Sequence, residues 1–88
     1  MLWFDQDKIS VDKRLLRAAD FYTKKYNILP NVCYCHDSDI PKNRVLTLLL
    51  YNNKEIKVQL IRSKSIRPNH FWIGNEANGK GKALNVTR

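Results

Sequence analysis

The stretch from residue 44 to residue 62, RVLTLLLYNNKEIKVQLIR, decides the fold of this chain. Two β-favouring runs, 44–51 and 55–62, flank the turn signal at 52–54, a pattern typical of a β-hairpin. A three-residue loop, with Tyr51 opposite Glu55, brings the alternating aliphatic side chains of both runs onto one face. A two-residue loop would turn one run over and set its leucines beside charged residues. We therefore expect a shared apolar face made of Leu46, Leu48, Leu50, Ile56, Val58 and Leu60.

Upstream of this hairpin, apolar residues recur at spacings of three and four. These residues are Val11, Leu15, Ala18, Ala19, Tyr22 and Tyr26. The spacing is typical of one face of an amphipathic α-helix. Ser10 is a suitable N-cap, and Asp12 in the first turn complements the helix dipole. Asn27 can adopt the left-handed conformation that ends a helix, and Pro30 prevents its continuation. The sequence therefore predicts a helix over 11–26.

Two further segments have β-favouring composition, 32–36 (VCYCH) and 70–74 (HFWIG). At the amino end, residues 1–9 hold the adjacent pair Trp3 and Phe4 among charged residues. That segment fits a short edge strand and a packed arm equally well. At the other end, the glycines and scattered apolar residues of 75–88 are typical of a disordered tail.

This order of elements predicts an α+β fold with one N-terminal helix packed on a small antiparallel β-sheet. We expect three to four strands, drawn from 32–36, 44–51, 55–62 and 70–74. A chain of 88 residues has room for one hydrophobic core. The expected organisation is a single domain over 1–74 followed by a flexible basic tail over 75–88.

The charge of the chain lies in its second half. The chain has 16 Lys and Arg against 8 Asp and Glu, a formal net charge of +8, and residues 1–41 sum to zero. A surface of one sign attracts polyanions, so the charge favours a nucleic-acid partner. An apolar fraction of 43% excludes a wholly disordered chain, and two cysteines exclude a disulfide-dense scaffold.

The leading hypothesis is a non-catalytic module that binds DNA or RNA. Basic residues alternate with aromatic ones across 62–72, where cations would contact phosphates and Trp72, Phe71 or Tyr51 could stack on unpaired bases. No zinc-finger, RNP-type or G-x-x-G signature is present. The residues expected to contact nucleic acid are Arg44, Lys57, Arg62, Lys64, Arg67, Lys80 and Lys82.

A catalytic alternative is metal-free cleavage of RNA by His70 with Arg62 and Arg67. In such reactions cations stabilise the charge that develops on the phosphate, and a histidine transfers protons. The size and the helix-then-sheet order are similar to small bacterial toxins that cleave messenger RNA. This similarity implies the same class of reaction, although the chain matches no diagnostic motif of such a family.

The cluster Cys33, Cys35 and His36 is the candidate metal site, because thiolate and imidazole are the usual zinc ligands. An extended strand places both thiols on one face and the imidazole on the other. Buried thiols that pack against the helix are therefore favoured, and we expect no cofactor. A further alternative is a protein-interaction module or a homodimer, formed through an edge strand or the mixed sheet face, with no nucleic-acid role.

We expect a cytoplasmic protein with free thiols and no contact with membranes. The longest unbroken apolar run is 48–51, whereas a membrane-spanning helix needs about 20 apolar residues. The acidic start also lacks the basic and then apolar pattern of a secretory signal.

Overall fold

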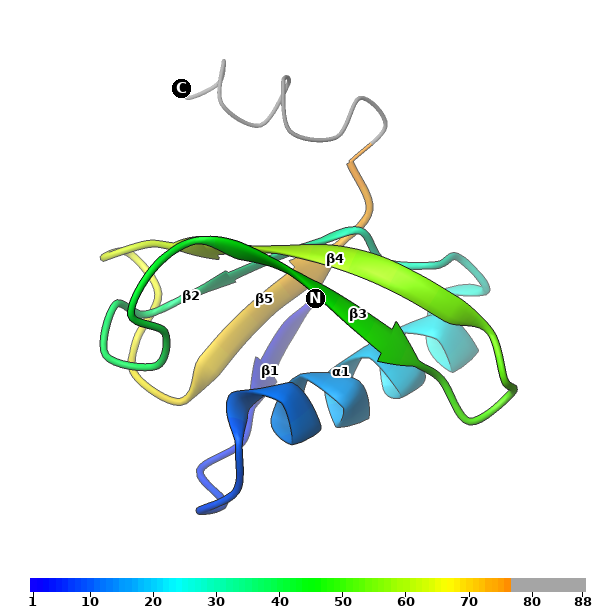
Figure 1. Ribbon diagram of the computed structural model, residues 1–88, viewed down its shortest axis with the longest axis horizontal. Coiled ribbons are helices and arrows are strands. Elements are labelled where there is room, and N and C mark those ends of the chain that lie inside the picture. Colours follow the sequence, from blue (N-terminus) through cyan, green and yellow to red (C-terminus); the bar gives the residue numbers. More distant parts are fainter. Residues whose placement is uncertain (77–88) are drawn as a thin grey trace.

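The computed structural model describes residues 1–76 and combines one helix with a five-stranded β-sheet (Figure 1). The elements are β1 (Leu2–Phe4), α1 (Val11–Tyr26), β2 (Val32–Cys35), β3 (Arg44–Leu49), β4 (Glu55–Arg62) and β5 (His70–Gly74). The predicted α+β class is confirmed. The residues expected in the tail beyond Glu76 lie outside the described part of the chain.

Helix α1 has the predicted bounds because its capping residues act as expected. The N–H of Lys13 donates to the side-chain oxygen of Ser10 at 3.2 Å, which satisfies one free donor of the first turn. Asn27 adopts the left-handed conformation, with φ of 57°, and its N–H donates to the carbonyl of Thr23. The apolar face of the helix packs in the core against the sheet, and Figure 1 shows α1 lying across one face of the sheet.

The sheet differs from the prediction in both strand number and strand direction. Its order is β1-β5-β2-β4-β3, and β2 runs parallel to β4 while the other neighbours are antiparallel. The expected sheet of three to four antiparallel strands is therefore wrong, because the sheet is five-stranded and mixed. The reason is that β4 lies between β2 and β3, so two reversals of the chain bring it back parallel to β2. Alternating hydrophobicity identifies strands but does not determine their neighbours.

The hairpin of β3 and β4 has the predicted shared face but a different register. Leu49, and not Tyr51, lies opposite Glu55, and the N–H of Leu50 donates to the carbonyl of Lys54 at 2.9 Å. The three-residue loop is therefore 51–53 and not 52–54. A left-handed residue ends such loops, and Asn53, with φ of 67°, adopts this conformation more readily than Lys54 would. Since the shift is by two residues, the expected aliphatic side chains all remain buried.

The face of the sheet opposite α1 is the open face, because no helix or strand of residues 1–76 covers it (Figure 1). The alternation of side chains along each strand assigns residues to it. Its apolar and aromatic members with exposed or half-buried side chains are Leu2, Phe4, Tyr34, Val45, Leu49, Ile61 and Trp72. An uncovered face with this composition is unusual for the surface of a small domain and is typical of an interaction site.

Arg14, a buried residue of α1, ties the loops at one end of the sheet to the helix. Its guanidinium donates to the carbonyl of Asp5 and to the side-chain oxygen of Asn69, each at 3.1 Å. It also lies 3.7 Å from the carboxylate of Asp39 and over the ring of Phe71. One cation thus holds the chain after β1, the loop after β2 and the loop before β5 in fixed positions.

Within the described residues 1–76, no helix is long and apolar enough to cross a membrane.

Candidate nucleic-acid interface

Cations gather at the end of the sheet where β4 ends and where β3 and β5 begin. This placement follows from the topology, because β2 and β4 end where their antiparallel neighbours start. We call this region the basic end, and it consists of Lys42, Arg44, Arg62, Lys64 and Arg67. Four of these five cations were predicted from the sequence, namely Arg44, Arg62, Lys64 and Arg67. Arg44, Arg62 and Arg67 belong to different segments of the sequence and come together only through the sheet.

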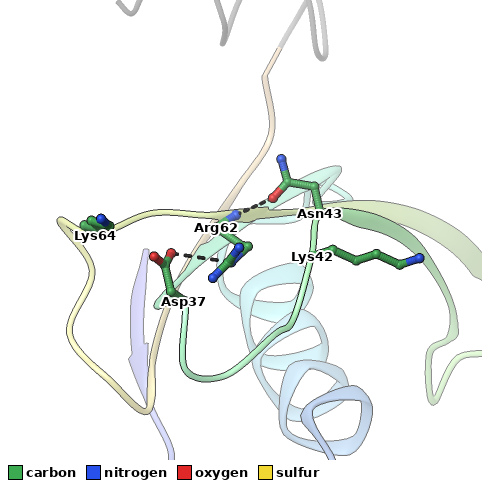
Figure 2. Close-up of a pocket in the computed structure, with 5 residues that line it drawn as sticks. All are labelled: Asp37, Lys42, Asn43, Arg62 and Lys64. Atoms are coloured by element: carbon green, nitrogen blue, oxygen red, sulfur yellow. Dashed lines mark hydrogen bonds and ion pairs between the residues drawn. The ribbon is translucent and has the colours of Figure 1, made fainter.

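A shallow hollow of about 520 Å³ lies at the basic end (Figure 2). Its lining residues are Asp37, Lys42, Asn43, Arg62 and Lys64. The side chain of Arg62 lies 3.6 Å from the carboxylate of Asp37, and its backbone N–H donates to the side-chain oxygen of Asn43 at 2.8 Å. Figure 2 shows Lys42 and Lys64 on opposite sides of this pair. The hollow therefore carries a partly neutralised arginine with a lysine on either side.

The cations at the basic end divide into paired and unpaired groups. Arg44 forms an ion pair of 2.8 Å with Asp12 of α1, and Arg62 faces Asp37. Lys42, Lys64 and Arg67 are exposed and form no ion pair among residues 1–76. An anionic partner can therefore bind these three side chains without breaking an ion pair within residues 1–76. The sequence did not single out Lys42, whose position beside Arg62 depends on the docking of β3 on β4.

Lys57 occupies a different position from the other predicted cations. It lies in the middle of β4, opposite Thr47 of β3, and its exposed side chain points to the open face. Lys57 is likewise without an ion pair among residues 1–76. It extends the positive charge from the basic end onto the open face. Lys80 and Lys82, the remaining predicted cations, lie outside the described residues.

Four rings cross three neighbouring strands on the open face and form what we call the aromatic row, Phe4, His70, Trp72 and Tyr34. Phe4 of β1 lies opposite His70 of β5, with ring centroids 4.8 Å apart. Tyr34 of β2 lies opposite Trp72 of β5, with centroids 5.8 Å apart. Phe4 is 55% exposed and Trp72 is 37% exposed. The first pair is tilted and the second is edge-to-face. Rings that face solvent in this way can stack on planar ligands.

Gly74 and Glu76 set the position of two rings of the row, Trp72 and Tyr34. A Cβ atom on Gly74 would lie only 2.8 Å from the indole of Trp72, so the indole rests directly over the glycine. The hydroxyl of Tyr34 contacts a carboxylate oxygen of Glu76 at 3.1 Å. The side-chain oxygen of Asn31 in turn accepts from the N–H of Glu76 at 2.9 Å. These contacts hold the indole and the phenol ring in place on the sheet.

Only one of the aromatic residues expected to stack on bases belongs to this row. Trp72 does, whereas Phe71 is fully buried beneath Arg14 and Tyr51 lies in the hairpin loop at the far edge of the sheet. Phe71 was assigned wrongly because neighbours in a strand point to opposite faces. Alternation along the strand places His70 on the same face as Trp72, so the sequence could have identified His70 as a member of the row. Phe4 and Tyr34 could not be identified in this way, because their positions beside β5 depend on the order of the strands.

His70 and Arg67, two residues of the catalytic alternative, line a second hollow of about 260 Å³. The hollow also includes Leu2, Ser65 and Ile66. Nδ1 of His70 lies 3.0 Å from the carbonyl of Pro68, which can only accept, so that nitrogen carries the proton. Arg62, the third residue of the catalytic alternative, lines the other hollow and faces Asp37. The structure thus brings two of the three residues together.

The cysteines of the candidate metal site are core residues. Cys33 and Cys35 are both fully buried on the face that packs against α1. Interaction with Cys35, together with burial, raises the pKa of the Cys33 thiol well above its ordinary value. The ring of His36 is hydrogen-bonded to Ser38. Among residues 1–76, no three His, Cys, Asp or Glu side chains are arranged to hold a metal ion.

Comparison of the chain with family models, with curated proteins and with solved structures finds no match. A functional proposal must therefore rest on the residues of the chain itself.

Proposed function

We propose that this protein binds single-stranded nucleic acid across the open face of its sheet. The observation that carries the proposal is the aromatic row, four exposed or half-buried rings that start beside the basic end. Bases would stack on these rings. Phosphates would contact those cations of the basic end and the open face that form no ion pair among residues 1–76, namely Lys42, Lys57, Lys64 and Arg67.

The arrangement favours a single strand over a duplex. Rings that lie on a sheet can stack only on bases whose faces are free, and bases in a duplex already stack on each other. The one helix within residues 1–76, α1, packs on the other face of the sheet and so does not share the face that carries the aromatic row. Stacking on an aromatic side chain contributes about 1–3 kcal/mol per base and depends little on base identity. We therefore propose binding with weak sequence preference.

Two features support binding without catalysis. His70 and Arg67 share a hollow, but Arg62 lies outside it and is engaged by Asp37. Cleavage of RNA also needs a second group to transfer a proton. His36, the other histidine, is bonded to Ser38 in the loop that follows β2. A small ribonuclease that uses His70 is the second candidate function. Its product, cleaved RNA, can be detected directly on a gel.

The proposal is tested by fluorescence anisotropy with labelled single-stranded and double-stranded oligonucleotides, both DNA and RNA. If all four unpaired cations contact phosphates, log K falls with log[salt] at a slope of about −3, from roughly −0.7 for each single-strand contact. That slope weakens binding by roughly 50-fold between 50 and 200 mM salt. The result that would overturn the proposal is no binding of any single strand at the lower salt.

Matched variants assign the binding to the open face. Trp72→Ala should weaken binding by roughly 5- to 100-fold, the equivalent of one stacked base. Lys64→Ala should reduce the salt slope by about 0.7. Lys24→Ala, an exposed change near the end of α1, is the matched control and should change neither quantity. Oligonucleotides recovered after binding are run on a denaturing gel, and RNA fragments that disappear with His70→Ala would favour the ribonuclease instead.

A further inference from the structure

The outer edge of β3 presents unpaired backbone groups. β3 is the last strand of the sheet and pairs only with β4. Because the N–H of Leu50 donates to Lys54, every second residue before it, Leu48 and Leu46, also directs its backbone groups at β4. Val45, Thr47 and Leu49 therefore direct their N–H and C=O groups outward. No backbone or side-chain hydrogen bond from residues 1–76 reaches these groups.

This edge lacks the features that usually prevent strands from adding to a sheet. Such features are charged side chains, proline, a bulge or a covering segment. Residues 45–49, VLTLL, contain neither a charge nor a proline, and their pairing with β4 runs without a bulge. The side chains of Val45 and Leu49 are 57% and 60% exposed beside the free backbone groups. The edge therefore offers hydrogen bonds and apolar contact to the same partner.

We propose that the β3 edge pairs antiparallel with the β3 edge of a second copy, with Thr47 opposite Thr47. In this register Val45 of each copy lies opposite Leu49 of the other. The exposed aliphatic side chains then meet across the seam on the open face. The outward N–H and C=O groups of all three residues find partners, since antiparallel neighbours exchange both bonds at alternate positions. The segment is thus complementary to itself about Thr47.

The distribution of charge favours a second copy in this orientation. Each chain carries a net charge of +8, so copies repel if their cations are brought together. Antiparallel pairing sets the start of β3, which belongs to the basic end, beside the hairpin loop of the other copy. The two basic ends then lie at opposite corners of the joined sheet. Beside β3, the unpaired cations nearest the seam within residues 1–76 are Lys54 of the hairpin and Lys57 of β4, and each is separated from it by a residue of the β3 segment, Leu50 and Thr47 respectively.

This inference does not depend on the proposed function, because the aromatic row lies on β1, β5 and β2, away from the seam. It has one consequence for that function. The two open faces become one continuous surface with one aromatic row toward each end. Nucleic-acid binding can fail in experiment while the dimer persists, and the reverse can also occur.

Sedimentation equilibrium of the full chain tests the assembly. We expect a mass of about twice 10.4 kDa at high micromolar concentration. Thr47→Pro removes an outward donor without removing a bond to β4, because proline is tolerated where the N–H of an edge strand faces solvent. That variant should be a monomer, and Thr47→Val, which keeps the N–H, should remain a dimer. A native chain that is monomeric at this concentration would overturn the inference.

Disulfide trapping tests the register and does not depend on how well the proline variant folds. Hydrogen-bonded antiparallel partners have Cα atoms about 5.5 Å apart, within the range of a disulfide. Thr47→Cys should therefore crosslink two copies under mild oxidation. Val45→Cys should not, because the two copies of residue 45 lie about 13 Å apart along the strands. A dimer that persists in Thr47→Pro, or crosslinking through position 45 and not 47, would contradict this interface.

Discussion

Replacing Arg14 with methionine should destabilise the domain more than any other single change at a charged residue. The side chain is 10% exposed and donates to the carbonyl of Asp5 and the amide oxygen of Asn69. Methionine keeps the volume beside Phe71 and the helix propensity but removes every donor. The carboxylate of Asp39 and both oxygens are left without their cationic partner.

The magnitude follows from these contacts. A hydrogen bond to a charged group contributes about 1.5–3 kcal/mol, and Arg14 makes two of them. Removing one partner of a buried ion pair costs about 3–5 kcal/mol, although the 3.7 Å separation from Asp39 places this pair at the weak end. Because these contributions overlap, we expect Arg14→Met to cost about 3 kcal/mol. For a domain of this size that loss lowers the melting temperature by about 15 °C.

Thermal unfolding followed by circular dichroism measures this loss, with urea unfolding as a second assay. Arg17→Met is the matched control, since Arg17 lies one turn further along α1 and its side chain, 44% exposed, pairs with the buried carboxylate of Asp5 and the exposed carboxylate of Asp7. Its effect should be several-fold smaller because solvent screens exposed pairs. A loss below about 1 kcal/mol for Arg14→Met, or equal losses for the two variants, would refute the inference that Arg14 holds the three segments in place.

Three further predictions follow from single contacts. Gly74→Ala should displace the indole of Trp72, visible as a shift in its fluorescence, and should weaken binding of single strands, whereas unchanged fluorescence would contradict the close approach. The Cys33 thiol, whose pKa is raised by interaction with its neighbour and by burial, should resist iodoacetamide in the native protein at pH 8 and react in urea. Burial opposes ionisation of Asp5, but hydrogen bonds from the N–H of residue 7 and from Arg17 outweigh it and lower the pKa of the carboxyl. The stabilisation from Asp5 is therefore present above its ordinary pKa of about 4 and is lost as the pH falls below it, so Asp5→Asn should flatten the drop in melting temperature between pH 5 and pH 3.

Local signals in the sequence were sufficient for the helix and for most strand positions. The spacing of apolar residues and the caps at Ser10 and Asn27 determine α1 because both act within a few residues. The paired aliphatic faces of β3 and β4 were predictable for the same reason. The exact register was not, because it depends on Asn53 adopting a left-handed conformation at the third position of the loop.

The site was predicted less completely than the fold because it is built from pairings between distant residues. Phe4 and His70 lie at opposite ends of the described chain and meet only because β1 pairs with β5. Arg44 and Arg62 were reasonable candidates by charge, yet Asp12 and Asp37 engage them. No local pattern reveals such partners, since a charge run in the sequence does not show which cations are already neutralised.

The position of β5 between β1 and β2 has a consequence for how this chain is synthesised. β5, the last of the strands within residues 1–76 to leave the ribosome, is an inner strand of the sheet with neighbours on both sides. Until residues 70–74 emerge, β1 has no partner and β2 exposes an unpaired edge. The described sheet therefore cannot be completed until residues 70–74 have left the ribosome, because contacts between the first and the last described strands must then form together. A nascent chain stopped before His70 should be digested readily by proteases, and the finished chain should resist them.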